Sequence, residues 1–134
     1  MSSSFVALDV GEKRIGVAVA DSAVRIAIPY VTIPVDGNEI KEIYTILEKE
    51  GADTLVIGYP RNQAGEATQQ TASVEAFVSQ IEDAAATIVY QDESLTSVMA
   101  EQRLESYKKP YERGEIDSMA ASIILQDYLE AHHG

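Results

Sequence analysis

One stretch of the sequence, FVALDVGEKRIGVAVA from Phe5 to Ala20, decides the fold. It holds two runs rich in Val, Ile and Ala, 5 to 10 and 14 to 20, with the polar link Gly11-Glu12-Lys13 between them. Runs of this composition are typical of strands, and a short polar link between two of them predicts a hairpin turn. The chain therefore opens with two antiparallel strands.

The rest of the chain adds extended and helical segments around this hairpin. A third apolar run, 24 to 35, predicts another antiparallel strand, and its two prolines place that strand at an edge of the sheet. Further elements are expected as helices over 39 to 50, 66 to 83, 96 to 107 and 116 to 131, and strands over 54 to 57 and 87 to 90. We therefore predict an α/β fold with a mixed five-stranded sheet, an antiparallel three-strand meander plus two parallel strands, flanked by helices.

Length and composition limit the possible classes of protein. The 134 residues, 46% hydrophobic and 24% charged, are typical of one globular domain, so residues 1–134 are expected to form a single domain. The absence of cysteine excludes disulfides, thiolate nucleophiles and cysteine-based zinc sites, and fits a cytoplasmic protein. No export signal and no apolar run of the ~18 residues that span a bilayer is visible, so no membrane partner is expected.

The net charge restricts how this chain could bind nucleic acid. Ten basic residues against 22 acidic ones give a formal net charge of −12. Proteins that bind nucleic acid use Lys and Arg to neutralise phosphates. Any nucleic acid must therefore be held by a local basic patch.

Acidic residues occupy two unusual positions in the predicted sheet. Asp9 lies within an apolar strand, where a carboxylate is costly unless it is paired, hydrogen-bonded or bound to a metal. A salt bridge to Lys13 or Arg14 across the turn is the simpler explanation. Asp92 and Glu93 follow the predicted strand 87 to 90, at the end of a parallel sheet where ligands gather. Favourable interaction with the positive end of the next helix explains them equally well.

A third acid, Asp117, starts the last predicted helix. Helix capping explains it alone, but the small residues Ser118, Ala120, Ala121 and Ser122 would let this helix lie close to the sheet and bring Asp117 toward Asp9. Converging carboxylates repel one another unless a divalent cation neutralises them. Mg²⁺ or Mn²⁺ suits such oxygen ligands, and two such ions can activate water and stabilise a leaving oxygen. Phosphodiester hydrolysis is the chemistry that this cluster would serve.

Four motifs in chain order resemble those of the YqgF/RuvX family of Holliday junction resolvases. They are LDVGEKRIGVA (8 to 18), VIGYPRN (56 to 62) with Gly65, DESLTS (92 to 97) and IDSMAA (116 to 121). The resemblance implies a ribonuclease H-like fold and a metal-dependent nuclease. It also implies that Asp9, Glu93 and Asp117 are the catalytic, metal-binding residues, with Asp92 as the alternative to Glu93. Family members act in cutting branched DNA or in maturing the 5′ end of precursor small-subunit ribosomal RNA.

Basic and loop residues near these motifs are candidates for contact with the nucleic acid. They are Lys13 and Arg14 in the hairpin, Gly58, Arg61 and Asn62 after the buried strand, and Lys108, Lys109 and Arg113 before the last helix. A solvated lysine or a self-satisfied turn is the simpler explanation for Lys13 and Asn62. Residues 103 to 113 carry four cations and two anions, a local charge of only +2. This weak patch favours an RNA precursor over a four-way DNA junction.

Competing functions follow from the departures from the family pattern. Ser94 stands where the family commonly has Arg, and Met99 where it has Glu. With the acidic surface, these changes favour the alternative of a non-catalytic ribonuclease H-like module that binds a ribosomal, transcription or recombination protein.

An actin-like ATP-binding fold would need a second, duplicated domain, for which 134 residues leave no space. Symmetric cutting of a junction would require a homodimer with two active sites.

Overall fold

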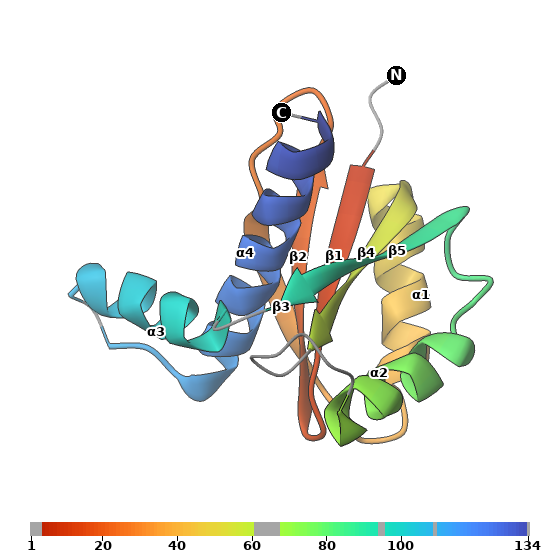
Figure 1. Cartoon of the computed structure of the whole chain (residues 1–134), viewed down its shortest axis with the longest axis horizontal. Helices are drawn as coiled ribbons and strands as arrows, with labels where there is room; N and C mark the ends of the chain where they lie inside the picture. The colour runs from red at the N-terminus through yellow and green to blue at the C-terminus, as the bar shows by residue number, and fades with distance from the viewer. Residues whose placement is uncertain (1–3, 61–67, 94–95, 109, 134) are drawn as a thin grey trace.

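Five strands form one mixed sheet, which helices cover on both faces (Figure 1). The structure is a computed structural model that describes residues 4–60, 68–93, 96–108 and 110–133. The strands are β1 (Ser4–Val10), β2 (Arg14–Asp21), β3 (Ile28–Pro34), β4 (Ala52–Pro60) and β5 (Thr87–Glu93), in the spatial order β3-β2-β1-β4-β5. The helices are α1 (Glu39–Glu50), α2 (Gln69–Ser79), α3 (Thr96–Ser106) and α4 (Arg113–His133).

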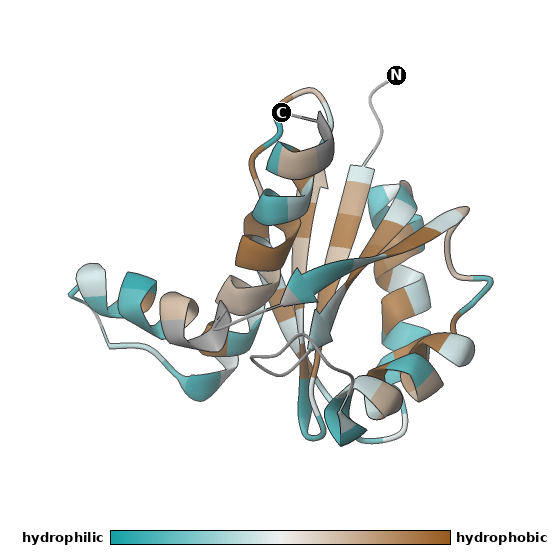
Figure 2. Ribbon diagram, in the orientation of Figure 1, coloured by the Kyte–Doolittle hydropathy of each residue, from teal (hydrophilic) through white to brown (hydrophobic). Residues whose placement is uncertain are grey.

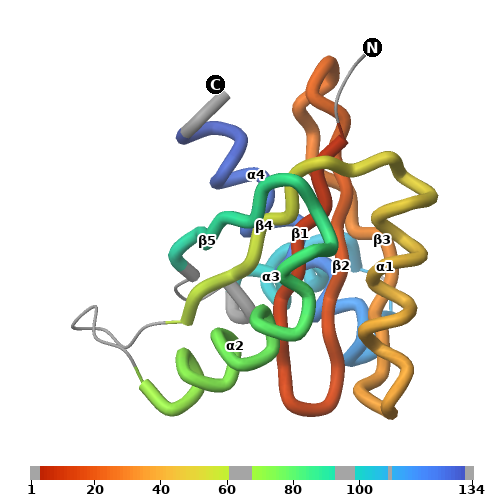
Figure 3. Tube along the Cα trace, turned by 90° about the vertical axis from the view of Figure 1, so that its right-hand side faces the viewer, coloured from red at the N-terminus to blue at the C-terminus, as the bar shows by residue number. Residues whose placement is uncertain are grey.

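The strand directions confirm the predicted combination of a meander and parallel strands. Strand β2 pairs antiparallel with both β1 and β3, and β3 lies at the sheet edge as its prolines indicate. Strand β4 pairs parallel with both β1 and β5. The parallel strands β1, β4 and β5 therefore run toward the same end of the sheet, the end at which the hairpin joins β1 to β2 (Figure 3).

Alternation along the strands divides the core between the two faces of the sheet. On β1, Val6 and Leu8 are buried in the core beneath α1 and α2. Phe5 and Ala7 are buried on the opposite face, against Ile124 and other residues of α4. Figure 2, coloured by hydropathy, shows hydrophobic residues concentrated along the strands and on parts of the helices that cover the sheet. Every second residue of β1 thus faces α4.

Helix α3 lies beside α4 and away from the sheet (Figure 1). A separate small cluster of buried residues joins the two helices: Ala100, Leu104, Met119, Ala120 and Ile123. Within the described part of the chain, no helix is long and apolar enough to cross a bilayer.

The third strand and the second helix are shorter than predicted. Residues 24 to 27 lie in a loop because Asp21 closes a turn: its Oδ1 accepts from the Ala23 amide at 2.7 Å and its carbonyl from the Arg25 amide at 2.8 Å. Helix α2 begins at Gln69 because Thr68 caps it, its hydroxyl accepting a bond from the Thr71 amide.

Three elements that reach the carboxyl end of the sheet, β4, β5 and α4, are longer than predicted. Strand β5 continues to Glu93 because its pairing with β4 runs on through Tyr59 with Asp92 and Pro60 with Glu93. Helix α4 begins at Arg113, so Gly114 belongs to its first turn rather than to a loop. The hydroxyl of Thr32 on β3 donates to the Gly114 carbonyl and fixes this turn against the sheet.

Candidate active site

Asp9 lies at the carboxyl end of β1, on the face of the sheet that α4 covers. Alternate residues of β1 face α4, and Asp9 follows Phe5 and Ala7, both of which are buried against that helix. Its side chain is half-buried, and its cross-strand partner in β2 is Gly16. Paired residues on antiparallel strands point to the same face, so Asp9 and position 16 both face α4.

Gly16 is where α4 comes closest to the sheet. A Cβ atom built on Gly16 would lie 1.9 Å from the backbone carbonyl oxygen of Asp117, and no residue other than glycine fits there without a shift of the helix. Of the small residues expected to permit this approach, Ser118 places its amide nitrogen 2.8 Å from the same Cβ position, whereas Ala120 packs in the cluster shared with α3. The backbones of Asp9 and Asp117 are thereby held on two sides of Gly16.

Sequence reasoning missed the role of Gly16. The available signal was a glycine in the interior of an apolar strand, which often marks a close backbone approach. Its partner in that approach, Asp117, is 101 residues further along the chain, so only the tertiary structure identifies the contact.

Arg14 forms an ion pair with Asp117. Its Nε donates to Oδ2 of the carboxylate at 2.6 Å, and the two side chains are 34% and 22% exposed. Within the described residues, Arg14 is thus engaged by Asp117 on α4 and not by Asp9. The hairpin salt bridge considered for Asp9 with Arg14 is therefore wrong. Asp117 lies in the second turn of α4, because that helix begins at Arg113, so it does not cap the helix.

Asp92 lies on the opposite face of the sheet from Asp9 and Asp117. It alternates with Ile88 and Tyr90, and Ile88 packs on the core beneath α1 and α2. The Tyr90 ring meets Tyr59 edge to face with 4.7 Å between centroids, and burial together with nearby Glu75 raises the Tyr90 pKa above its usual 10.0. Asp92 is exposed and pairs in register with Tyr59.

Glu93 ends β5, and its backbone lies in register with Pro60. Its position is one residue beyond Asp92, in the odd-numbered series that includes Val89, a residue packed against the α4 core. Among the residues whose side chains the structure describes, no three His, Asp or Glu side chains gather as a metal-binding group. Asp9 and Asp117 are the two members of the predicted triad whose side chains are described.

The predicted substrate contacts are only partly grouped around these acids. Lys13 is exposed in the hairpin beside Arg14, while Gly58 is buried inside β4 and not in a loop, because β4 continues to Pro60. Its amide therefore belongs to the sheet and is not presented to a phosphate. Lys108 is exposed directly after α3. Of the other predicted contacts, Arg113 is exposed one helical turn before Asp117 at the start of α4, whereas Arg61, Asn62 and Lys109 lie outside the described residues.

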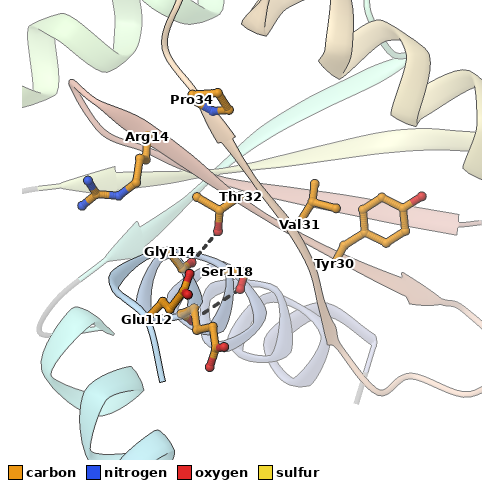
Figure 4. A pocket seen from close by; sticks show the side chains of 9 residues that line it. Arg14, Tyr30, Val31, Thr32, Pro34, Glu112, Gly114 and Ser118 are labelled. Carbon is orange, nitrogen blue, oxygen red and sulfur yellow. Dashed lines mark hydrogen bonds between the residues drawn. The ribbon is translucent and has the colours of Figure 1, made fainter. Parts of the chain in front are cut away.

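A groove runs from Arg14 along the edge of β3 to the first turns of α4 (Figure 4). Its lining includes Thr32, Glu112, Gly114, Glu115 and Ser118. Arg14 lies at one end of this groove, and Figure 4 shows the bond between Thr32 and Gly114 across its floor. The groove was not predicted, because β3 and the start of α4 are some 80 residues apart in sequence.

Solved structures share this arrangement of strands and helices. RuvC of Thermus thermophilus, solved in complex with a Holliday junction substrate, superposes with a TM-score of 0.58 and 13% identity, covering 98% of this chain and 96% of that one. A second structure of Thermus thermophilus RuvC gives a TM-score of 0.56 and 9% identity over 96% of this chain and 95% of that one. The chain therefore has the ribonuclease H-like fold, as the resemblance implies.

Sequence relatives identify the family. The model of the RuvX family, described as Holliday junction resolvase, matches residues 3–131, and the chain belongs to this family of nucleases. Relatives named "Putative pre-16S rRNA nuclease" occur in Chloroflexus aurantiacus (44% identity, 94% of this chain and 86% of the relative) and Chloroflexus aggregans (43%, 96% and 94%). A third, from Synechocystis, is 39% identical over 92% of this chain and 84% of the relative.

Proposed function

We propose that this protein is a divalent-cation-dependent endonuclease that hydrolyses phosphodiester bonds of structured nucleic acid, with Asp9, Glu93 and Asp117 as its catalytic, metal-binding residues. The observation that carries the proposal is the junction at Gly16, which holds Asp9 and Asp117 at the carboxyl end of the sheet. Ligand sites of parallel sheets lie beyond this end. The alternation of β5 favours Glu93 over Asp92 as the third acid, because Asp92 is on the opposite face.

The donor set fits a hard cation. Asp9 and Asp117 supply carboxylate oxygens, the ligands that Mg²⁺ and Mn²⁺ prefer, and no nitrogen or sulfur ligand is needed. Such an ion, when bound, supplies Lewis acidity toward water and toward the phosphodiester oxygens. The role of the acidic residues is to hold the positively charged ion next to the phosphodiester of the nucleic acid. Hydrolysis adds water across one P–O bond and leaves a phosphate on one fragment and a hydroxyl on the other.

The basic residues position the strand in this proposal. Lys13 and Arg14 lie at the hairpin, and Arg113 is one helical turn before Asp117 on α4. The proposed contact surface also includes Arg61, Asn62, Lys108 and Lys109. Gly58 makes no contact with phosphate in this proposal and contributes only as a residue of β4. These contacts carry little sequence information, because they are made to phosphates.

We propose the precursor of small-subunit ribosomal RNA as the substrate, cut in the cytoplasm by residues 1–134 acting as a single nuclease domain. The names of the relatives support this choice, and so does the acidic net charge of −12, which disfavours wide contact with a four-way junction. If the substrate is a four-way junction, symmetric cutting requires two active sites, and a homodimer remains the prediction for that case.

Cleavage of matched substrates tests the proposal. Purified protein is incubated in Mg²⁺ or Mn²⁺ with a ribosomal RNA precursor and with a four-way DNA junction, as wild type, Asp9→Asn, Glu93→Gln and Asp92→Asn. We expect metal-dependent cutting of the RNA that Asp9→Asn and Glu93→Gln reduce by at least about a hundredfold, because loss of even an outer-shell partner of a metal ligand costs about 10- to 100-fold. Asp92→Asn is the matched control. Folded wild type that cuts neither substrate would instead support the non-catalytic binding module.

A further inference from the structure

The bond between Arg14 and Asp117 engages a carboxylate that the proposed function assigns to a metal ion. Nε of Arg14 donates to Oδ2 of Asp117 at 2.6 Å, across 103 residues of sequence. Arg14 opens β2 beside the hairpin, while Asp117 lies against Gly16 in α4. The guanidinium thus occupies a carboxylate that a metal cation would also bind, so the two cations compete for Asp117.

We propose that Arg14 is an exchangeable counter-ion. It neutralises Asp117 while the acidic site is free of metal, and it releases the carboxylate to a divalent cation and binds a phosphate of the nucleic acid instead. This inference rests on the proposed function. It adds that Arg14 binds Asp117 before the metal ion arrives and a phosphate of the nucleic acid afterwards.

Charge explains why the metal-free site needs a cation of its own. Asp9 and Asp117 are held on two sides of Gly16, and carboxylates brought together repel each other. The positive charge of Arg14 offsets this repulsion. A divalent cation does the same with two charges, so the guanidinium and the metal ion stabilise the same carboxylate and oppose each other when both are present.

Exposure makes the bond weak enough to exchange. The Arg14 and Asp117 side chains are 34% and 22% exposed, so water screens the pair. An ion pair of this kind contributes little to stability. Arg14 can therefore leave Asp117 without unfolding the hairpin, whose backbone is fixed by its own pairing with β1 and β3.

The unused part of the guanidinium explains the second partner. Within the described part of the chain, Arg14 bonds through Nε alone, and its two terminal amino groups make no hydrogen bond. These groups form the edge of the guanidinium that binds phosphate in a bidentate manner. Arg14 is one of the residues that line the groove along β3 (Figure 4), and its side chain is 34% exposed, so a nucleic-acid strand can reach this edge of the guanidinium.

A fixed orienting role for Arg14 makes the opposite prediction for metal binding. If Nε served to hold Asp117 in the geometry that the ion requires, loss of Arg14 would weaken metal binding. If Arg14 is a competing counter-ion, loss of its charge strengthens metal binding. The sign of the change in metal affinity therefore separates the two roles.

Mn²⁺ binding to the full chain without nucleic acid is the test, measured by titration calorimetry on wild type, Arg14→Gln, Arg14→Lys and Lys41→Gln. We expect Arg14→Gln to lower the Mn²⁺ Kd about fivefold, the factor that loss of a partly exposed ion pair of about 1 kcal/mol gives. Arg14→Lys, which keeps the charge, should change it less than about twofold, as should Lys41→Gln on the exposed side of α1. In cleavage assays, Arg14→Gln should raise KM for the nucleic acid.

Two results would overturn the inference, and Asp9→Asn in the same series separates them. If Arg14→Gln leaves Mn²⁺ binding unchanged or weaker while Asp9→Asn abolishes it, the exchange role is wrong and the proposed function stands. If wild type and Asp9→Asn bind Mn²⁺ equally, the metal site is elsewhere, and the proposed function and the role of Arg14 fail together.

Discussion

Gly16 of β2 lies directly against the backbone of Asp117 on α4, so closely that a Cβ atom on Gly16 would lie 1.9 Å from the Asp117 carbonyl oxygen. Because Gly16 is also the cross-strand partner of Asp9, one missing side chain sets the separation of two acidic residues from opposite parts of the chain. Strand β1, strand β2 and helix α4 are thereby fixed at one point of the sheet.

Gly16→Ala is expected to separate the two acids. The added methyl group must push α4 from the sheet, and overpacking of this kind destabilises a protein by about 1–3 kcal/mol. Urea denaturation measures the free energy of unfolding, and cleavage should fall further than stability alone explains. Gly114→Ala is the matched control, because its Cβ would meet Thr32 at an ordinary 3.6 Å and its helical site favours alanine by up to about 1 kcal/mol. Equal effects of the two substitutions would contradict this account.

Thr32→Val is expected to loosen the start of α4. The Thr32 hydroxyl donates to the Gly114 carbonyl, and loss of one such bond costs about 1 kcal/mol. Hydrogen exchange of the first turns of α4 should rise in the variant. Thr45→Val in α1 removes a hydroxyl whose one partner among the described residues is the Lys41 carbonyl of its own helix, so it should change stability by less than about 0.5 kcal/mol. Unaltered exchange in α4 would show that this bond does not hold the helix.

Much of the sheet was predictable from local patterns. The hairpin of β1 and β2 follows from two apolar runs around a polar link, and the edge position of β3 from its prolines. Strand β5 was predicted to end at Tyr90 because Gln91, Asp92 and Glu93 are polar, yet backbone pairing with β4 continues past them. Pairing of this kind depends on a neighbouring strand, which a local pattern does not contain.

The candidate site was predictable in its acids but not in its contacts. Asp9 is conspicuous as a charge in an apolar strand, and its place at the carboxyl end follows from the parallel strands. The ion pair of Arg14 with Asp117 joins residues 103 positions apart, and nothing in either local sequence indicates it. The same holds for the approach of Asp117 to Gly16, which depends on how α4 packs across the sheet.

Mn²⁺ should stabilise the wild-type protein. A ligand that binds only the folded state adds about 1.4 kcal/mol at ten times its Kd. Thermal unfolding at increasing Mn²⁺ should therefore show a rising midpoint, and both Asp9→Asn and Asp117→Asn should reduce this rise. EDTA-treated samples give the unfolding midpoint of each protein without metal. A midpoint that rises equally in all three proteins would point to binding outside the acidic site.

Stability should depend on pH through Asp127 of α4. Burial and the nearby charge of Glu130 raise the pKa of Asp127 above its usual 3.8, although Arg103 lowers it in part. A raised pKa means that the protonated form stabilises the fold, an effect fully present below 3.8 and lost as the pH rises through the folded pKa. Asp127→Asn should therefore increase stability at pH 7, with a smaller difference at pH 3.5, in urea denaturation. A difference that grows toward low pH would reverse the assigned sign.

Anomalous diffraction from a crystal of the protein soaked in Mn²⁺ tests the central claim most directly, because it locates the ion without assuming activity. The account predicts an anomalous peak within about 2.5 Å of carboxylate oxygens of both Asp9 and Asp117, with Glu93 beside it. An Asp9→Asn crystal soaked in the same way should lose most of this peak. A wild-type crystal with strong Mn²⁺ peaks elsewhere and none between Asp9 and Asp117 would contradict the claim.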